Sequence, residues 1–356
     1  MKVLVGMSGG VDSSVSAALL LEQGHEVVGG FIKNWSDSKD LWTGECQWRG
    51  ERRDAIRVAA KLGIPLLTFD FEKEYRAAVI DELFRGYAAG ETPNPDVLCN
   101  EFIKFGLFFD QMDKLGFDAV ATGHYARVDQ DEQGVAHLLM GKDAEKDQSY
   151  FLYRVSQSVL RRTLFPIGEF EKSHVRELAE KFALPVAQKP DSQGICFIGK
   201  LDMVEFLRKK IPSRPGEIVD DTGKVLGQHT GLDAYTIGQR ERILVSQGAE
   251  AWYVAKKDVE QNRLVIVQGA EHPLLYTKEI LVRDLHWTRG VVPKETFSCQ
   301  VRTRYRQALV GARLEPHGED QWLVTFEEPV KAVAAGQSAV FYEGEECLGG
   351  GVIVPS

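Results

Sequence analysis

The first 125 residues alternate short apolar runs with longer amphipathic stretches. The apolar runs have the length of buried strands, at residues 3–5, 27–32, 66–69 and 119–122. Between them, apolar residues recur with helical spacing at residues 13–21, 52–62, 75–89 and 101–115. Alternating strands and helices predict an α/β fold with a parallel sheet that is covered on both faces.

The pattern changes further along the chain. Residues 142–210 are predicted to be mostly helical, most clearly at 175–182 and 203–209. The sequence PSRPG at residues 212–216 indicates a domain boundary, because proline and glycine interrupt regular structure. We therefore expect the first domain to cover residues 1–210.

Two β-rich regions are expected after this boundary. Short alternating runs predict hairpins that pair residues 217–219 with 224–226 and residues 252–256 with 264–267. Runs at 323–326, 339–341 and 350–354 predict a small β-barrel. The expected domains are a central β-rich domain at 211–276 and a C-terminal β-barrel at 277–356.

A glycine-rich loop follows the first predicted strand. Residues 6–13 read GMSGGVDS, and their glycines let the backbone approach a polyanion closely. The helix that follows offers unpaired N–H groups and the positive end of its dipole to an anion. Ser8 and Ser13 can donate hydrogen bonds, and Asp12 can hold Mg²⁺ against phosphate oxygens. The loop matches neither a Walker A motif nor a dinucleotide fingerprint. It predicts a nucleotide site, the alternative being a strand–helix turn without a ligand. The polar segment 34–50 is expected to form a loop over this site.

Composition narrows the choice of partners and compartments. The 356 residues carry a net charge of −9, so an RNA partner would need a locally basic surface. No apolar stretch is long enough to span a membrane, and the chain starts directly with a strand, so we expect a cytoplasmic protein. The five cysteines are widely spaced and form no metal-binding pattern, so no protein-only metal site is expected.

Two cysteines are candidates for chemistry. Cys99 lies in NPDVLCN, where Asn100 is predicted to cap a helix that starts at residue 101. A thiol just before a helix N-terminus has a lowered pKa, and Asp96 could act as an acid or base beside it. Cys196 lies in a polar loop that contains glycine, which would suit a carrier that moves between partners. The alternative for each is a structural cysteine.

A basic row is predicted near the C-terminus. If residues 302–306 (RTRYR) form a strand, Arg302, Arg304 and Arg306 share one face and Tyr305 lies on the other. Such a row would suit phosphate and base contacts. The alternative is an ordinary exposed face of the barrel.

Motifs along nearly the whole chain resemble one enzyme family. SGGVDSS is similar to the loop of the PP-loop ATP pyrophosphatase superfamily, whose members cleave ATP between the α- and β-phosphates. Together with this loop, the segments KNW, NPDVLCN, TGHYAR, KDQSYFL, DSQGICFIG, YTIGQR and RYRQ resemble the tRNA-specific 2-thiouridylase family.

The resemblance implies ATP-dependent 2-thiolation of the wobble uridine of tRNA. In this family ATP adenylylates uracil O2, and a sulfur-relay protein loads sulfur as a persulfide on the cysteine matching Cys196. The cysteine matching Cys99 is the nucleophile that releases this sulfur, which leaves a disulfide, and Asp96 matches the proposed acid/base residue.

The resemblance also implies roles for the domains and binding residues. Residues 1–210 would form the ATP-binding catalytic domain, residues 211–276 would position tRNA, and the barrel at 277–356 would bind tRNA. ATP, with Mg²⁺, would contact Gly6, Met7, Ser8, Gly9, Gly10, Val11, Asp12, Ser13, Ile32 and Gly123. The tRNA would contact Asn94, Pro95, Asp96, His124, Lys146, Asp147, Gln148, Arg304, Tyr305 and Gln337. Ile32 departs from the methionine that is frequent in the family, with little expected effect because both side chains are apolar and similar in volume. Without the resemblance, His124 would be a structural histidine, and residues 146–148 a solvated turn.

Three alternatives remain. Two are other PP-loop enzymes, a GMP synthetase and a 4-thiouridine synthase. No glutaminase-like domain is visible, and residues 1–5 leave no room for an N-terminal RNA-binding domain. The third is an RNA-binding protein without activity, against which Asp12, Cys99 and Cys196 argue because all three are present.

Overall fold

The computed structural model describes residues 1–36, 46–191, 203–243, 245, 250–293 and 295–355. Its N-terminal part is built on a parallel sheet with the strand order β3-β2-β1-β4-β7. The strands are β1 (Lys2–Gly6), β2 (Glu26–Lys33), β3 (Leu66–Asp70), β4 (Ala119–Ala121) and β7 (Thr163–Leu164). The four strands expected from the apolar runs are confirmed, and so is the parallel arrangement.

Helices cover both faces of this sheet. Alternate strand residues face opposite sides, so Val3 and Val5 pack in one apolar cluster and Leu4 in the other. The cluster of Val3 and Val5 also contains side chains from α1 (Val11–Glu22), α2 (Gln47–Leu62) and α8 (Lys172–Lys181). The cluster of Leu4 contains side chains from α3 (Glu72–Tyr75), η1 (Arg76–Ile80), α4 (Asp81–Ala88), α5 (Pro95–Leu98), η2 (Cys99–Leu107) and α6 (Phe108–Lys114).

Three sequence-based expectations need correction here. The stretch 142–210 is not mostly helical: besides η3 (Ser149–Phe151), α7 (Gln157–Leu160), α8 and α9 (Met203–Arg208), its described residues hold β7 and many turns. The helix expected at 101–115 begins earlier, at Pro95. The expected loop at 34–50 already contains the start of α2, and its residues 37–45 lie outside the described part.

The central region is a small sheet with the order β10-β11-β8-β9. Its strands are β8 (Gly216–Val219), β9 (Val225–His229), β10 (Trp252–Asp258) and β11 (Arg263–Gln268). Both expected hairpins are present, because β8 pairs antiparallel with β9 and β10 with β11. Its core includes Ile218, Val254 and Leu264, all completely buried.

The C-terminal region is a closed antiparallel barrel. Its strands are β12 (Tyr276–Trp287), β13 (Phe297–Arg302), β14 (Val310–His317), β15 (Gln321–Lys331), β16 (Ser338–Glu343) and β17 (Glu346–Ile353), and pairing of β12 with β17 closes the ring. The expected barrel is therefore confirmed. A hairpin from the N-terminal part, β5 (Ala126–Gln130) and β6 (Ala136–Met140), extends the barrel sheet through a β6–β17 contact, which was not expected.

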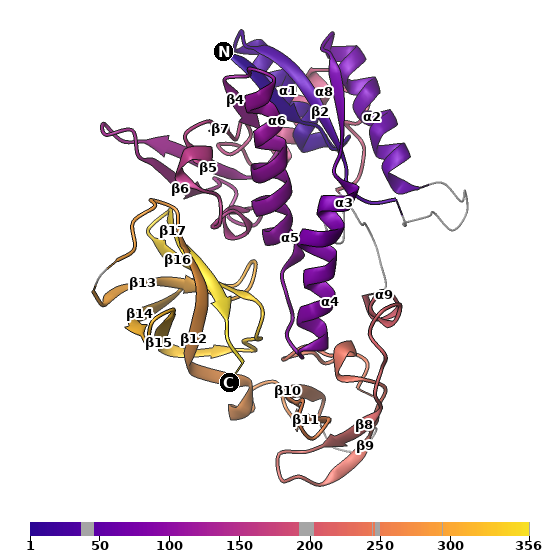
Figure 1. Cartoon of the computed structure of the whole chain (residues 1–356), viewed down its shortest axis with the longest axis vertical. Coiled ribbons are helices and arrows are strands. Elements are labelled where there is room, and N and C mark those ends of the chain that lie inside the picture. The colour runs from indigo at the N-terminus through magenta and orange to yellow at the C-terminus, as the bar shows by residue number, and fades with distance from the viewer. Residues whose placement is uncertain (37–45, 192–202, 244, 246–249, 294, 356) are drawn as a thin grey trace.

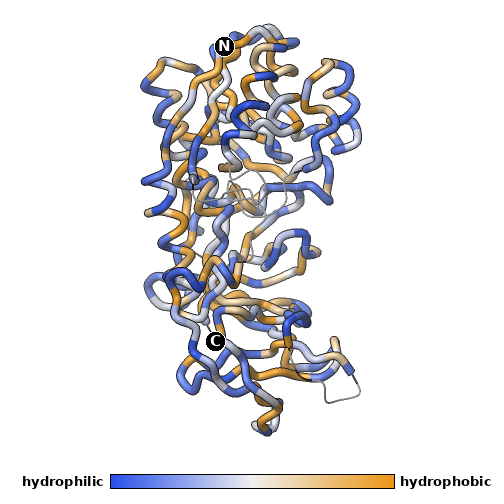
Figure 2. Tube along the Cα trace, turned by 90° about the vertical axis from the view of Figure 1, so that its right-hand side faces the viewer, coloured by the Kyte–Doolittle hydropathy of each residue, from blue (hydrophilic) through white to orange (hydrophobic). Residues whose placement is uncertain are grey.

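The molecule is elongated. The parallel sheet lies near the N-terminus, the barrel lies below the β5–β6 hairpin, and β8–β11 lie at the far end (Figure 1). Hydrophobic and hydrophilic stretches alternate along the whole trace (Figure 2). Among the described residues, no helix combines the length and the hydropathy needed to cross a bilayer.

Candidate functional site

The glycine-rich loop (residues 6–13) lies where the strand order of the parallel sheet reverses. After β1 the chain enters α1 and returns to β2 on one side, whereas β4 pairs with β1 on the other side. In open α/β sheets, ligands bind beyond the carboxyl ends of the strands at such a point. The loop therefore occupies the position expected for a nucleotide site.

Hydrogen bonds within the loop hold its shape. Ser8 N donates to Ser13 Oγ at 3.2 Å, and Gly10 N donates to Ser8 Oγ at 3.3 Å. Ser14 Oγ donates to the Gly10 carbonyl at 2.6 Å, at the start of α1. Gly9 has a φ of +74°, and a Cβ there would lie 2.2 Å from the carbonyl oxygen of Glu51 in α2. Any larger residue at position 9 would strain the loop and push it away from α2.

Gly123 closes the other side of the loop. It lies two residues after β4, and a Cβ at this position would lie 2.6 Å from Ser13 N and 2.7 Å from the carbonyl carbon of Asp12. The segment that follows β4 therefore touches the first turn of α1. Ile32, the other residue expected at the nucleotide, is buried near the end of β2.

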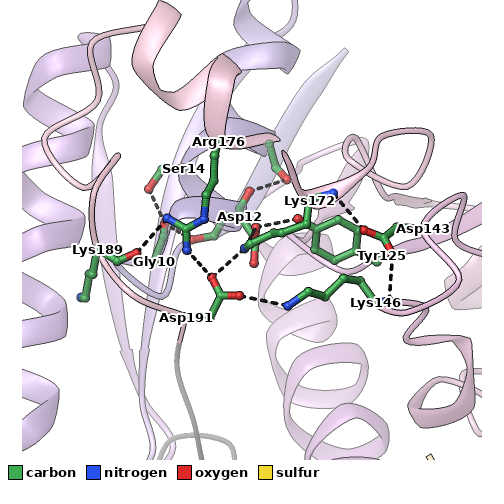
Figure 3. A network of polar contacts seen from close by, with 12 residues as sticks. Gly10, Asp12, Ser14, Tyr125, Asp143, Lys146, Lys172, Arg176, Lys189 and Asp191 are labelled. Atoms are coloured by element: carbon green, nitrogen blue, oxygen red, sulfur yellow. Dashed lines mark hydrogen bonds and ion pairs between the residues drawn. The ribbon is translucent and has the colours of Figure 1, made fainter. Parts of the chain in front are cut away.

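Asp12 is the acidic residue of the first turn of α1. Its Oδ1 accepts hydrogen bonds from Tyr125 Oη at 2.9 Å and from Lys172 Nζ at 2.7 Å (Figure 3). Burial and the nearby Asp12 carboxylate raise the pKa of Tyr125, so its hydroxyl keeps its proton and remains a donor. Tyr125 is the residue just before β5 and Lys172 comes from the start of α8, so two distant segments converge on Asp12.

A cation cluster, defined as Lys146, Lys172 and Arg176, surrounds Asp191 beside this loop. Asp191 Oδ1 lies 2.9 Å from Lys172 Nζ and 2.8 Å from Arg176 Nη2, and Oδ2 lies 3.1 Å from Lys146 Nζ. Despite partial burial, these lysines lower the pKa of Asp191 to about 2. The carboxylate is therefore ionised at any physiological pH.

A further lysine braces the loop from the opposite side. Lys189 Nζ donates to the Gly9 carbonyl at 2.9 Å and pairs with Asp54 at 2.7 Å. Nearby, burial raises the pKa of Glu51 to about 7, partly offset by Lys189. Within the described residues, no group of three or more His, Cys, Asp or Glu side chains is placed to hold a metal ion.

Cys99 is not at a helix N-terminus, which corrects the sequence-based expectation. The cap is Asn94, whose Oδ1 accepts from Asp96 N and Val97 N at 3.2 and 3.3 Å, with Pro95 in the first turn. Cys99 follows within the same continuous helix, where η2 begins, and is completely buried. The argument that a helix dipole activates this thiol is therefore wrong. Asn100, the expected cap, instead donates to the Phe151 carbonyl.

The segment before Cys99 contacts the barrel. Gln337 Nε2 donates to the Thr92 carbonyl at 2.7 Å, and Thr92 N donates to the Ala335 carbonyl at 2.8 Å. Gln337, expected at tRNA, thus contacts the segment that leads to Asn94, another residue expected there.

His124 is enclosed by its own chain. Its Nδ1 lies 2.7 Å from Thr122 Oγ1, its Nε2 lies 3.3 Å from Lys104 Nζ, and its ring lies edge-on to Phe165. Burial, and secondarily Lys104, hold the pKa of His124 well below its usual value of 6.5. The imidazole is therefore neutral and its two nitrogens are engaged within the protein.

The three residues 146–148 have different surroundings. Lys146 belongs to the cation cluster, and Gln148 Oε1 accepts from Tyr125 N at 3.0 Å. Asp147 is buried and paired with Arg302 at 3.0 Å, so its carboxylate is turned away from solvent. The side chain of Asp147 therefore faces the protein interior, which disfavours the direct tRNA contact expected for it.

The basic row does not form. Arg302 is the last residue of β13 and is buried against Asp147, whereas Arg304 and Arg306 lie exposed in the following turn. Arg306 has a φ of +64°, which no regular strand has. Tyr305 packs on Phe151 with ring centroids 4.5 Å apart, so this turn is part of the junction with the N-terminal region.

Four cysteines remain besides Cys99. Cys196 lies outside the described residues. Cys347 is completely buried, and Cys299 packs partly buried against the barrel core, where burial raises the pKa of its thiol to about 12. Cys46 Sγ donates to the Ser36 carbonyl at 3.0 Å.

Several site residues were missed from the sequence: Tyr125, Lys172, Arg176, Lys189 and Asp191. Lys172 and Arg176 are four positions apart, a spacing that places two cations on one face of a helix. Tyr125 lies inside the quoted TGHYAR motif, directly after two residues that were singled out. Both signals were available, but pairing with Asp12 and Asp191 depends on contacts between distant segments.

Comparison with known families covers most of the chain. Residues 1–200 match the model described as "tRNA methyl transferase HUP domain", residues 204–268 the "tRNA methyl transferase PRC-barrel domain", and residues 277–353 the "Aminomethyltransferase beta-barrel domain". Among solved structures, a 4-thiouridine synthetase–RNA complex with bound ATP aligns with 59% of this chain and 50% of that chain, at 19% identity and a TM-score of 0.38. That likeness is too low to bear on function.

Curated relatives are similar over the full length. A tRNA-specific 2-thiouridylase of Proteus mirabilis is 48% identical over 99% of this chain and 96% of its own length. One from Enterococcus faecalis is 46% identical over 99% of this chain and 95% of its own length. With this identity and coverage, the chain belongs to the tRNA-specific 2-thiouridylase family.

Proposed function

We propose that this protein is an ATP-dependent tRNA 2-thiouridylase that replaces O2 of the wobble uridine by sulfur. The observation that carries the proposal is the glycine-rich loop at the switch point of the sheet, in a chain 48% identical to a tRNA-specific 2-thiouridylase. The polar contacts of Asp12 support it, because they gather an acidic residue and a lysine where a triphosphate would bind.

The first step activates the base. Uracil O2 attacks the α-phosphorus of ATP, the bond from this phosphorus to the bridging oxygen breaks, and the electron pair leaves with pyrophosphate. Backbone N–H groups at the start of α1 and the hydroxyls of Ser8 and Ser13 would stabilise the phosphate charge. Ile32 would pack against the adenine, and Gly123 lets the nucleotide site close on α1.

Magnesium would bind through Asp12 and phosphate oxygens. One carboxylate plus substrate phosphates is a common donor set for Mg²⁺, so the residues present fit the ion. When bound, it would neutralise charge on the leaving pyrophosphate. Lys172, which now pairs with Asp12, would then be available to the phosphates.

The second step transfers sulfur. The terminal sulfur of a persulfide on Cys196, loaded by a sulfur-relay protein, attacks C2, and Cys99 then attacks the Cys196 sulfur. AMP leaves with the former O2, and the Cys99–Cys196 disulfide retains the two-electron oxidation, which a dithiol reverses. Asp96, on the first turn of the same helix as Cys99, would take the uracil N3 proton when O2 is adenylylated and return it when the thiocarbonyl forms.

The tRNA would lie across the junction between the catalytic region and the barrel. Asn94 and Pro95 would contact the uracil, which must be flipped out of the stack before its O2 can react. Gln337, Arg304 and Tyr305 come from the barrel side of this junction, and the two exposed arginines of the turn supply local positive charge. Contacts of His124, Lys146 and Gln148 with tRNA remain predictions.

The test is direct. Purified protein, ATP, Mg²⁺, sulfide and an unmodified tRNA transcript are incubated, and nucleosides are analysed by mass spectrometry. We expect 2-thiouridine and equimolar AMP, because each adenylylation releases one AMP on sulfur attack. AMP formation without 2-thiouridine, or 4-thiouridine as the product, would contradict the proposal.

A cysteine variant tests the sulfur route. With a persulfide-loaded donor protein, Cys196→Ser should lose at least about 10³-fold of thiolation rate, as expected when a covalent carrier is removed, while tRNA affinity stays unchanged. Cys299→Ser is the matched control, because that thiol packs in the barrel and should be dispensable. Thiolation by Cys196→Ser at the wild-type rate would exclude the carrier role.

A further inference from the structure

Three cationic side chains meet on the single carboxylate of Asp191, next to the glycine-rich loop. They come from two segments, Lys146 from the turn before η3 and Lys172 and Arg176 from α8 (Figure 3). The nearby Asp143 carboxylate accepts from the backbone N–H groups of Lys146 and Lys172, so the side-chain cations of the cluster face Asp12 and Asp191 instead.

The cluster is directly connected to the nucleotide loop. Lys172 Nζ lies 2.7 Å from Asp12 Oδ1 and 2.9 Å from Asp191 Oδ1, so one ammonium group bridges the two carboxylates. The Lys172 side chain is 12% exposed, which fixes its ammonium group between α1 and residue 191. A phosphate that extends from the loop toward α8 would therefore contact the cluster at Lys172.

Asp191 and such a phosphate would need the same donors. Both oxygens of Asp191 are already occupied by cations, at distances of 2.8 to 3.1 Å. A phosphate oxygen takes the same donors, with similar lengths and with charge assistance. Each N–H that turns to the phosphate is lost to Asp191.

We propose that the cation cluster binds the pyrophosphate part of ATP and that Asp191 is an internal anion that competes for it. The inference rests on the proposed function, because pyrophosphate is the leaving group of the adenylylation step. The cluster stabilises charge as the bond between the α- and β-phosphates breaks. Asp191 then recovers the cations and speeds the departure of pyrophosphate. This assigns Lys146 a phosphate ligand, separate from the tRNA contact implied by the family resemblance.

The permanent charge of Asp191 supports the competing role. The neighbouring lysines keep its pKa near 2, so no change of pH in the physiological range relieves the competition. Arg176 is also held by the carbonyls of Ala187 and Lys189, at 3.3 and 3.2 Å, so the chain leading to Asp191 is fixed on α8. The carboxylate is thus held close to the cations in a defined position.

The test measures anion binding by calorimetry with the full chain and without RNA. Inorganic pyrophosphate and AMP are the probes, each with and without Mg²⁺. Lys172→Met and Lys146→Met should each weaken pyrophosphate binding about tenfold, the scale of one charge-assisted hydrogen bond, and leave AMP binding within about twofold. Asp191→Asn should tighten pyrophosphate binding about tenfold and slow its dissociation.

Lys181→Met is the matched control, because Lys181 lies on the same helix and pairs with Glu22 on the exposed surface. It should bind both probes as the wild type does. Unchanged or weaker pyrophosphate binding by Asp191→Asn overturns the competing role, and an equal loss of AMP and pyrophosphate binding by both lysine variants overturns the subsite. If 2-thiouridine fails to form while these affinity changes appear, the proposed function fails and the subsite stands.

Discussion

At the scale of single residues, burial decides the charge of several side chains around the candidate site. The Tyr125 hydroxyl stays protonated beside Asp12, and the buried Glu51 carboxyl has a pKa near 7. The His124 imidazole is kept neutral by burial among Phe105, Phe165 and Lys104. These environments set donors and acceptors before any ligand binds.

His124 should make the protein sensitive to mild acid. Its pKa is lowered in the folded state, so the unfolded chain binds more protons below its ordinary value of 6.5. Stability should therefore be lost as the pH falls below 6.5, by up to about 1.4 kcal/mol per pH unit from this group. Thermal unfolding midpoints between pH 7.5 and 5.5 should fall less steeply for His124→Gln. His174→Gln, an exposed control on α8, should keep the wild-type slope. Equal slopes for all three proteins would show that protonation of His124 does not destabilise the folded state.

At the scale of elements, the site depends on the close approach of two backbones. The segment that follows β4 touches the first turn of α1 at Gly123, where no side chain fits. The glycine-rich loop also lies against α2, which Gly9 permits. The position of the first helical N–H groups, and with them the phosphate site, follows from these two contacts.

Gly123→Ala should damage nucleotide binding. Its Cβ would lie 2.6 Å from Ser13 N, so α1 or β4 must shift, at a cost of about 1–3 kcal/mol. We expect ATP affinity, measured by calorimetry, to fall at least about tenfold. Gly50→Ala in α2 is the control, because nothing lies within 4 Å of a Cβ there and alanine favours a helix. Wild-type ATP affinity in Gly123→Ala would mean that the loop can adjust without affecting the phosphate site.

Elements with strong local patterns could be predicted from the sequence, whereas those that depend on distant contacts could not. The buried strands and the hairpins gave clear periodic signals, and they are confirmed. The β5–β6 hairpin was missed because β5 reads ARVDQ, a polar strand that is held by pairing with β6, which in turn pairs with β17 of the barrel. The helix start at Pro95 did have a local signal, since Asn94 followed by proline is a typical cap. That signal was overlooked in favour of Asn100.

The candidate site shows the same division. The glycine-rich loop and its place after β1 were predictable, because the loop's function depends on backbone shape encoded by consecutive residues. The partners of Asp12 were not, since Tyr125 and Lys172 are 113 and 160 positions away from it. The arginine row failed for a related reason: Arg302, the last residue of β13, is bonded to the distant Asp147, and the chain then enters a turn.

At the scale of the whole molecule, the catalytic region and the barrel are joined by polar contacts that lead back to the site. Asp147 accepts from Arg302 of β13, from Ser149 Oγ and from the backbone N of Gly141. Its neighbours Lys146 and Gln148 contact Asp191 and Tyr125, respectively. The turn around Asp147 is therefore held by the barrel on one side and supports the nucleotide site on the other.

Breaking the Asp147–Arg302 pair should loosen this junction. Both side chains are buried, at 0% and 8% exposure, so removing one partner leaves an uncompensated charge and should cost about 3–5 kcal/mol. Asp147→Asn and Arg302→Met should each lower the urea midpoint and weaken ATP binding, because Lys146 and Gln148 lose their support. The double variant should lose clearly less stability than the sum of the two single losses, since no lone charge remains buried. Arg313→Met, on the exposed surface of β14, should change stability by less than about 0.5 kcal/mol. Additive losses in the double variant would mean that the two residues act through separate contacts, and the barrel would then support the nucleotide site by a route other than this ion pair.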